Sequence, residues 1–224
     1  MKINSIYDDM VASASLIPCG VNVKCIFRHS FRPPLHNSIN PDNVLLSEEG
    51  KRQAIAFGVG IEYKLGSIHS SYIQRCQQTV QYILKERHDC SAIILSQNEL
   101  SNIFATNKEE ADKTIIEYSL KGVVYKLCIG ETLRGLQSID YCVTNILDYI
   151  FNTGNEANTI DLYCTHDFHL AMIYAMLLSE NKAYDDIVSN WPNMLEGMFF
   201  WGTRNDFHCL WRRKYKHIEN NLIL

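Results

Sequence analysis

Hydrophobic residues along the chain alternate between short continuous runs and longer segments with helical spacing. The short runs are apolar, several of them rich in β-branched residues, and polar residues bound them, which is typical of buried strands. The longer segments place apolar residues three or four positions apart, which predicts amphipathic helices. The predicted strands are 21–27, 66–71, 91–95 and 159–164, and the predicted helices are 4–16, 48–65, 73–87, 108–119, 133–151 and 168–179.

The order of these segments predicts the fold class. Strands that alternate with helices favour an α/β fold with a mostly parallel central sheet covered on both faces, a three-layer α/β/α sandwich. Two further strand-like runs, 194–201 and 206–212, flank a turn and predict a hairpin near the C-terminus. The less regular stretch at about 97–130 is expected to be a small insertion within a single domain spanning residues 1–224.

Composition narrows the functional classes. The 21 basic and 25 acidic residues give a net charge of −4, so the chain lacks the basic character that binding to a nucleic-acid backbone requires. No apolar run approaches the ~20 residues that cross a bilayer, and acidic residues interrupt the N-terminal segment, so we expect no membrane partner and no secretory signal. The eight cysteines form no CxxC pair. We expect them to be reduced in a cytoplasmic protein, although their even number leaves disulfides open.

Polar clusters follow three of the predicted strands. They are residues 28–33 (RHSFRP), 70–75 (SSYIQR) and 165–167 (THD). Because the carboxyl ends of parallel strands meet at one edge of a sheet, we expect these clusters to converge. Guanidinium groups match phosphoryl oxygens in bidentate fashion, a neutral imidazole can attack phosphorus, and a carboxylic acid can protonate a leaving oxygen. The three clusters therefore predict a site for phosphoryl chemistry.

Four segments that contain or adjoin these clusters occur in a fixed order. They are residues 28–33 (RHSFRP), 46–53 (LSEEGKRQ), 70–79 (SSYIQRCQQT) and 165–167 (THD). In that order they are similar to RHGxRxP, LTxxGxxQ, SSxxxRxxxT and HD, the motifs of the histidine phosphatase superfamily in its acid-phosphatase branch. The resemblance implies a phosphoglycerate-mutase-like fold, and it covers most of the chain.

The resemblance also implies a role for each matching residue. The implied site residues are His29, His166 and Asp167 for catalysis, and Arg28, Arg32, Arg75 and His166 for binding phosphate. His29 is the nucleophile, and the flanking arginines are expected to lower its pKa by like charge and keep it neutral. Asp167 is the implied proton donor, and Glu131 remains its rival because the mutase-like branch uses a glutamate from a loop in the middle of the chain. No metal and no cofactor are implied, because the arginines neutralise the phosphoryl charge.

The function implied is metal-independent hydrolysis of a small-molecule phosphomonoester through a phosphohistidine. Ser30 stands where the family has glycine, which keeps open a catalytically weak homologue that binds a phosphorylated ligand. A phosphomutase-like phosphotransferase is the third alternative. Too few residues separate Arg75 from His166 for a large helical cap, so we expect an open pocket whose specificity comes from 33–45, 97–130 and 180–193.

Other residues near the motifs are expected to be structural. His69 is expected to point to the core or to solvent. His169 lies three residues beyond His166, but no third ligand at metal-binding spacing accompanies it. Trp191 and its aromatic neighbours are expected to pack in the core, and the basic run 212–214 is expected to be solvated.

Overall fold

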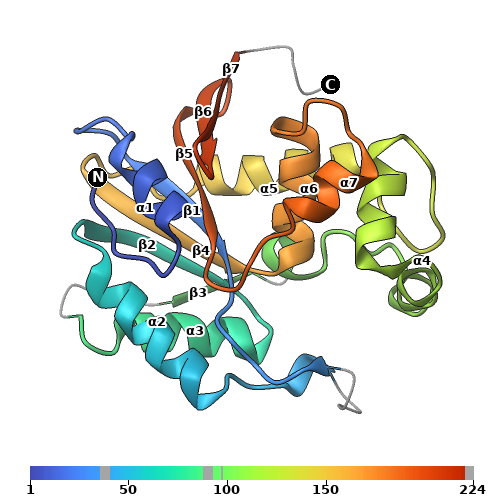
Figure 1. Cartoon of the computed structure of the whole chain (residues 1–224), viewed down its shortest axis with the longest axis horizontal. Coiled ribbons are helices and arrows are strands. Elements are labelled where there is room, and N and C mark those ends of the chain that lie inside the picture. The colour runs from blue at the N-terminus through green and yellow to red at the C-terminus, as the bar shows by residue number, and fades with distance from the viewer. Residues whose placement is uncertain (36–40, 88–92, 97, 220–224) are drawn as a thin grey trace.

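A seven-stranded sheet forms the centre of the computed structural model, which describes residues 1–35, 41–87, 93–96 and 98–219. The strands lie in the order β3-β2-β4-β1-β5-β6-β7 (Figure 1). They are β1 (Val23–Arg28), β2 (Lys64–Ser71), β3 (Ile93–Ser96), β4 (Thr159–Thr165), β5 (Gly197–Thr203), β6 (Asp206–Trp211) and β7 (Lys214–Glu219). Strands β1 to β4 are parallel to one another, whereas β5, β6 and β7 pair in antiparallel fashion. The prediction of a mostly parallel sheet is confirmed at its core.

Helices cover both faces of the sheet, so the predicted three-layer sandwich is confirmed. One layer contains α1 (Asp8–Ser15), α2 (Glu48–Gly60) and α3 (Gln74–Leu84), and the other contains α4 (Lys108–Cys128), α5 (Ile139–Asn152), α6 (Asp167–Leu177) and α7 (Tyr184–Ser189) (Figure 1). Alternation along β1 supplies both cores, because Cys25 and Phe27 enter the first and Ile26 the second. Two single turns are also described, a 3-10 turn η2 (Pro41–Asn43) and a π-helical turn η3 (Asn98–Asn102).

The N-terminal boundaries differ from the sequence prediction. The first helix, predicted over 4–16, begins only at Asp8, and Ile3 forms a β-bridge with Ile61. Helix α2 ends at Gly60, directly before this bridge, whereas the prediction continued the helix to residue 65. Pairing with a distant segment therefore overrides the helical spacing of the residues at both ends of this contact.

The described part of the segment 97–130, predicted as an insertion, contains η3 and α4, and α4 packs against α6 and α7. Helix α4 is longer than the predicted 108–119 and is kinked at Ser119, where φ is 61°. Helix α5 begins later than predicted because the Ser138 side chain accepts a hydrogen bond from the Tyr141 N–H and caps it there. Helix α7 and strand β7 were not predicted.

Two global features bear on the sequence expectations. Among the helices in the described ranges, none is both long enough and apolar enough to cross a bilayer. The seven cysteines in these ranges are free thiols, and six of them are buried. The eighth, Cys90, and residues 91–92 of the predicted strand 91–95 lie outside the described residues.

Candidate active site

Strand register brings the predicted residues together at the carboxyl edge of the parallel sheet. In the pairing of β1 with β4, Arg28 lies opposite Thr165, so the residues that follow them, His29 and His166, leave the sheet side by side. The His29 N–H donates to the Thr165 carbonyl at 3.0 Å and extends this register by one residue. The described wall of the cavity at this edge, which encloses about 160 Å³, includes five of the predicted site residues, His29, Arg32, Arg75, His166 and Asp167. The predicted convergence of the three strand ends is therefore present.

His29 is buried, and hydrogen bonds fix the orientation of its ring. Its Nδ1 lies 2.8 Å from the Ser30 carbonyl, which only accepts, so Nδ1 carries the proton. Its Nε2 accepts a hydrogen bond from Arg75 Nε at 3.1 Å. Burial holds the pKa of His29 well below its ordinary value of 6.5, and the charges of His166, Arg75 and Arg28 lower it further. The imidazole is therefore neutral, with its basic nitrogen directed toward a guanidinium group.

Three guanidinium groups surround this imidazole. Arg75 lies in the first turn of α3, and its Nη2 is 3.3 Å from His166 Nδ1. Burial, followed by the charges of Arg75 and Arg28, lowers the pKa of Arg32 to about 10. Within the described part of the chain, the buried Nε atoms of Arg28 and Arg32 have no hydrogen-bond partner. Like charges held this closely, with donors that no protein acceptor satisfies, favour a bound oxyanion.

His166 is oriented by a hydroxyl that the sequence analysis did not assign. The Ser71 Oγ at the end of β2 lies 3.1 Å from His166 Nε2, and it also lies 2.8 Å from Ser101 Oγ. The His166 ring stands at 68° to the His29 ring, with centroids 5.6 Å apart. Ser71 belongs to the double-serine motif, so the motif itself was the available signal for this contact.

Asp167 begins α6, and its two carboxylate oxygens have different partners. Oδ1 accepts the N–H of the next residue, Phe168, at 3.0 Å. Oδ2 lies 2.9 Å from Arg28 Nη2 and accepts a hydrogen bond from Trp191 Nε1 at 3.2 Å. Trp191, expected to be a packing residue, therefore contacts a predicted site residue. No local pattern around position 191 could have indicated this, because the contact joins α6 to the segment before β5.

Glu131, the rival of Asp167, lies elsewhere. Its carboxylate pairs with Lys126 at 2.8 Å beyond the end of α4. It is absent from the described wall of the cavity, which includes Asp167. Of the two carboxylates that the sequence offered, the structure brings Asp167 to His29.

Ser30, which replaces the family glycine, points away from the cavity. Its Oγ donates to the Gly50 carbonyl at 2.7 Å, and its N–H donates to Thr79 Oγ1 at 2.9 Å. A side chain at Gly50 would place its β-carbon 2.0 Å from the Phe31 carbonyl, so the glycine of the second motif allows α2 to approach this turn. The second and third motifs thus support the backbone around His29.

The two remaining histidines near the motifs differ in their surroundings. His69 is buried in the sheet, with Nδ1 2.7 Å from the Tyr149 hydroxyl and its ring stacked on Tyr163. His169 is fully buried beside the cavity, and neither of its ring nitrogens has a partner among the described residues. Over the same residues, no three His, Cys, Asp or Glu side chains are grouped so as to hold a metal ion.

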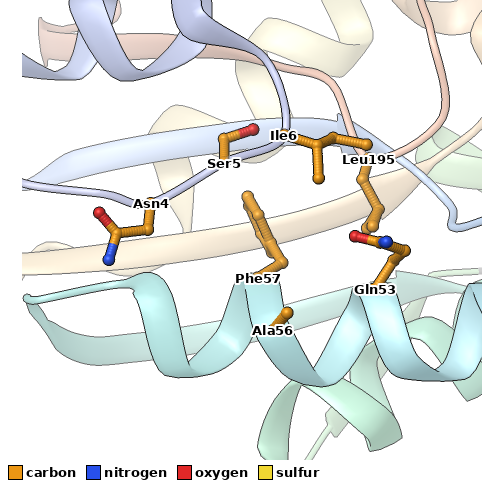
Figure 2. Close-up of a pocket in the computed structure, with 7 residues that line it drawn as sticks. All are labelled: Asn4, Ser5, Ile6, Gln53, Ala56, Phe57 and Leu195. Carbon is orange, nitrogen blue, oxygen red and sulfur yellow. The ribbon is translucent and has the colours of Figure 1, made fainter.

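A second cavity of about 210 Å³ lies between the N-terminal segment and α2 (Figure 2). Its lining is mostly apolar and includes Ile6, Phe57 and Leu195, whose side chains face one another. It contains none of the predicted site residues.

Comparison with known proteins places the fold. No family model and no curated protein sequence matches the chain. A structure titled mycobacterial hydrolase 1 has a TM-score of 0.58 at 12% identity and covers 89% of this chain and 97% of its own. Mycobacterial glucosyl-3-phosphoglycerate phosphatase has a TM-score of 0.53 at 12% identity, with 89% and 98% covered. The protein histidine phosphatase SixA, complexed with tungstate, has a TM-score of 0.50 at 12% identity, with 87% and 93% covered.

The chain has the fold of the histidine phosphatase superfamily. The predicted phosphoglycerate-mutase-like architecture is confirmed, whereas the acid-phosphatase branch stays a prediction.

The lowered pKa of His29 predicts an acid-sensitive stability. Above pH 6.5 the imidazole is neutral in both the folded and the unfolded chain, so it does not affect the equilibrium. As the pH falls below 6.5, His29 binds a proton in the unfolded chain but stays neutral in the folded one. The free energy of unfolding therefore falls by up to about 1.4 kcal/mol per pH unit. His29→Asn should make the pH dependence of the urea-unfolding free energy shallower by about that amount. Equal slopes for the two proteins would contradict a neutral, buried His29.

Proposed function

We propose that this chain is a phosphomonoester hydrolase that acts on a small-molecule substrate through a phosphohistidine formed on His29. The observation that carries the proposal is the hydrogen bond from Arg75 Nε to His29 Nε2. It directs the basic nitrogen of a buried, neutral imidazole toward the position where guanidinium groups would hold a phosphoryl group. The shared fold supports a phosphatase, because the neighbours named above include two phosphatases.

The positive charge needed for catalysis comes from the protein itself. Arg28, Arg32 and Arg75 offer forks of N–H donors that match phosphoryl oxygens, and they are fixed before substrate binds. Preorganised charge of this kind supplies most of the rate enhancement in phosphoryl transfer. The proposed hydrolase therefore works without a metal.

In the first step, the His29 Nε2 lone pair forms a bond to phosphorus, and the bond from phosphorus to the leaving oxygen breaks. Asp167 donates a proton to that oxygen, so the product leaves as a neutral alcohol. A phosphomonoester carries an exchangeable proton near pH 6. A substrate bound as the monoanion can pass this proton to Asp167 when its oxygens take over the Arg28 donors.

In the second step, water attacks the phosphorus of the phosphohistidine on the face opposite the nitrogen. Asp167 accepts a proton from that water, the bond from phosphorus to nitrogen breaks, and His29 recovers its lone pair. Asp167 passes this proton to the departing phosphate, which leaves as the monoanion, and the regenerated carboxylate returns to its ion pair with Arg28. The same carboxyl group thus serves both half-reactions, as microscopic reversibility requires.

The other residues of the cavity wall favour a substrate whose leaving group carries little negative charge. Beyond the motif residues, the described wall includes apolar side chains from two of the three segments expected to set specificity. These are Leu35, Phe104 and Leu120. Asp42 adds a carboxylate on the same wall, which is ion-paired with Lys108 at 2.9 Å. Among the described lining residues, the arginine and lysine side chains are Arg32 and Arg75, both part of the proposed phosphate site.

Substitution of the nucleophile tests the proposal directly. His29→Ala should lower the rate of p-nitrophenyl phosphate hydrolysis by at least about a thousandfold, because no other described group occupies the same position. The wild-type chain, quenched during turnover of a ³²P-labelled substrate, should carry an acid-labile and base-stable label that the variant lacks. His208→Ala, at a half-buried histidine on β6 that is absent from the described wall of the cavity, is the matched control and should keep full turnover. Labelling or turnover in His29→Ala would refute the assignment.

The proton-donor role predicts a dependence on the leaving group. Asp167→Asn should slow hydrolysis of phenyl phosphate, a poor leaving group, by about a hundredfold, and 2,4-dinitrophenyl phosphate by only a few-fold. Glu131→Gln should leave both rates unchanged, because that carboxylate lies beyond α4. Equal slowing of the two substrates by Asp167→Asn, or a selective effect of Glu131→Gln, would reverse the assignment.

Substitution of Ser30, the residue after the proposed nucleophile, distinguishes an active enzyme from a weak homologue that only binds a ligand. Because the Ser30 hydroxyl is bonded to Gly50, Ser30→Gly should leave kcat/KM within about twofold and lower the unfolding free energy by about 1 kcal/mol. Steady-state kinetics and urea unfolding measure the two effects. A large gain in activity would instead favour the weak homologue.

A further inference from the structure

The segment Trp191–Glu196, which we call the clamp loop, lies between α7 and β5. Its backbone contacts the end of β1 and the residue that follows it, His29. The Arg28 N–H donates to the Glu196 carbonyl at 3.0 Å. The Leu195 N–H lies 3.1 Å from the Arg28 carbonyl and 3.3 Å from the His29 carbonyl. The loop is therefore hydrogen-bonded to Arg28, a proposed phosphate ligand, and to His29, the proposed nucleophile.

Leu195 shows that the loop is held under constraint. Its φ is 62°, in the left-handed region that a β-carbon disfavours. Its side chain is buried and lines the second cavity, where it faces Ile6 and Phe57 (Figure 2). Apolar packing on α2 thus anchors one end of the clamp loop in a conformation that it would not adopt alone.

A partly buried ion pair between Glu196 and Arg212 holds the rest of the loop. The Glu196 side chain is 3% exposed, and both of its carboxylate oxygens accept hydrogen bonds from Arg212. Arg212 Nε donates to Oε1 at 2.5 Å, and Arg212 Nη2 donates to Oε2 at 2.7 Å. The same Oε2 accepts the Asn193 N–H at 2.8 Å, and Arg212 Nη2 also donates to the Trp191 carbonyl at 3.1 Å. The expectation that the basic run 212–214 is simply solvated is wrong for its first residue.

The other end of the loop contacts the proposed reaction groups. Trp191 Nε1 donates to Asp167 Oδ2 at 3.2 Å, and the Pro192 carbonyl accepts Arg28 Nη1 at 2.7 Å. Arg28 Nη2 in turn lies 2.9 Å from Asp167 Oδ2. A continuous set of contacts therefore runs from Arg212 through Trp191 to the carboxyl group of Asp167.

From these contacts we infer that Glu196 and Arg212 are positioning residues for the proton donor. Neither lies on the described wall of the cavity, so neither would touch substrate. They fix the Trp191 backbone, and the Trp191 indole then orients Asp167 Oδ2 and stabilises the carboxylate that remains after the proton has left. The inference rests on the proposed function and deepens it, because it assigns two partners to its proton-transfer step.

Two neighbouring arginines provide a matched comparison. Arg213 is adjacent in sequence, and its ion pair with Asp9 is exposed, with 62% and 55% of the side chains accessible. Arg212→Gln should lower kcat/KM for phenyl phosphate about tenfold, and that for 2,4-dinitrophenyl phosphate by less than about twofold. Inhibition by inorganic phosphate should stay unchanged, because the arginines beside His29 are intact. Arg213→Gln should leave all three measurements unchanged.

Two further variants keep the test decisive if Arg212→Gln does not fold. Trp191→Phe removes the indole N–H and keeps the ion pair, so it should reproduce the same dependence on the leaving group. Glu196→Gln removes the charge and replaces one of the two acceptor oxygens with an amide donor, so it should have an effect of the same kind. Equal loss for good and poor leaving groups in Trp191→Phe would assign the loop a purely structural role and overturn the inference.

A spectroscopic measurement separates this inference from the proposed function. The Trp191 indole N–H resonance, identified by its loss in Trp191→Phe, should shift in Arg212→Gln and in Asp167→Asn but not in Arg213→Gln. An unchanged resonance in Arg212→Gln overturns the positioning inference whatever the activity. Failure of the wild-type chain to hydrolyse any phosphomonoester, together with the expected shifts, would overturn the proposed function and retain the contact pathway to Asp167.

Discussion

The mutual repulsion of positive groups around His29 is the constraint on which the site depends. Three guanidinium groups lie close to one buried imidazole, and burial together with the like charges lowers the pKa values of His29 and Arg32. The Asp167 carboxylate offsets only part of this positive charge, so the rest of the fold must hold the groups in place. Parallel strand register fixes His29 beside His166, and the first turn of α3 fixes Arg75. Burial and repulsion together keep the imidazole neutral, and the positive charge around it favours a bound oxyanion.

Much of the site could be predicted from the sequence because its residues lie at fixed distances from predictable elements. His29, Arg75 and His166 each follow a strand whose apolar residues are evident in the sequence, and parallel topology brings those strand ends together. The motifs then assigned chemistry to the positions. The order of strands and helices was sufficient for the fold class, although not for β7 or α7, which are short and have weak patterns of their own.

What the sequence did not reveal are contacts between distant segments. The bridge from Ile3 to Ile61 shortened two helices, and no local pattern indicates such pairing. Arg212 lies in a basic run whose sequence is typical of a solvated surface, yet it forms a partly buried ion pair with Glu196. The role of Trp191 depends on the path of a loop whose anchor, Leu195, has a backbone angle that is unusual for leucine. These features arise from tertiary packing, which local propensity does not encode.

The ion pair between Arg28 and Asp167 also governs how a reaction cycle would close. The carboxylate and an anionic ligand compete for the same guanidinium donors, so every bound phosphate must displace an internal rival. In the proposed reaction, regeneration of the Asp167 carboxylate would make that rival available again when inorganic phosphate departs. The free protein would then carry its own competitive ligand, which would weaken retention of the product.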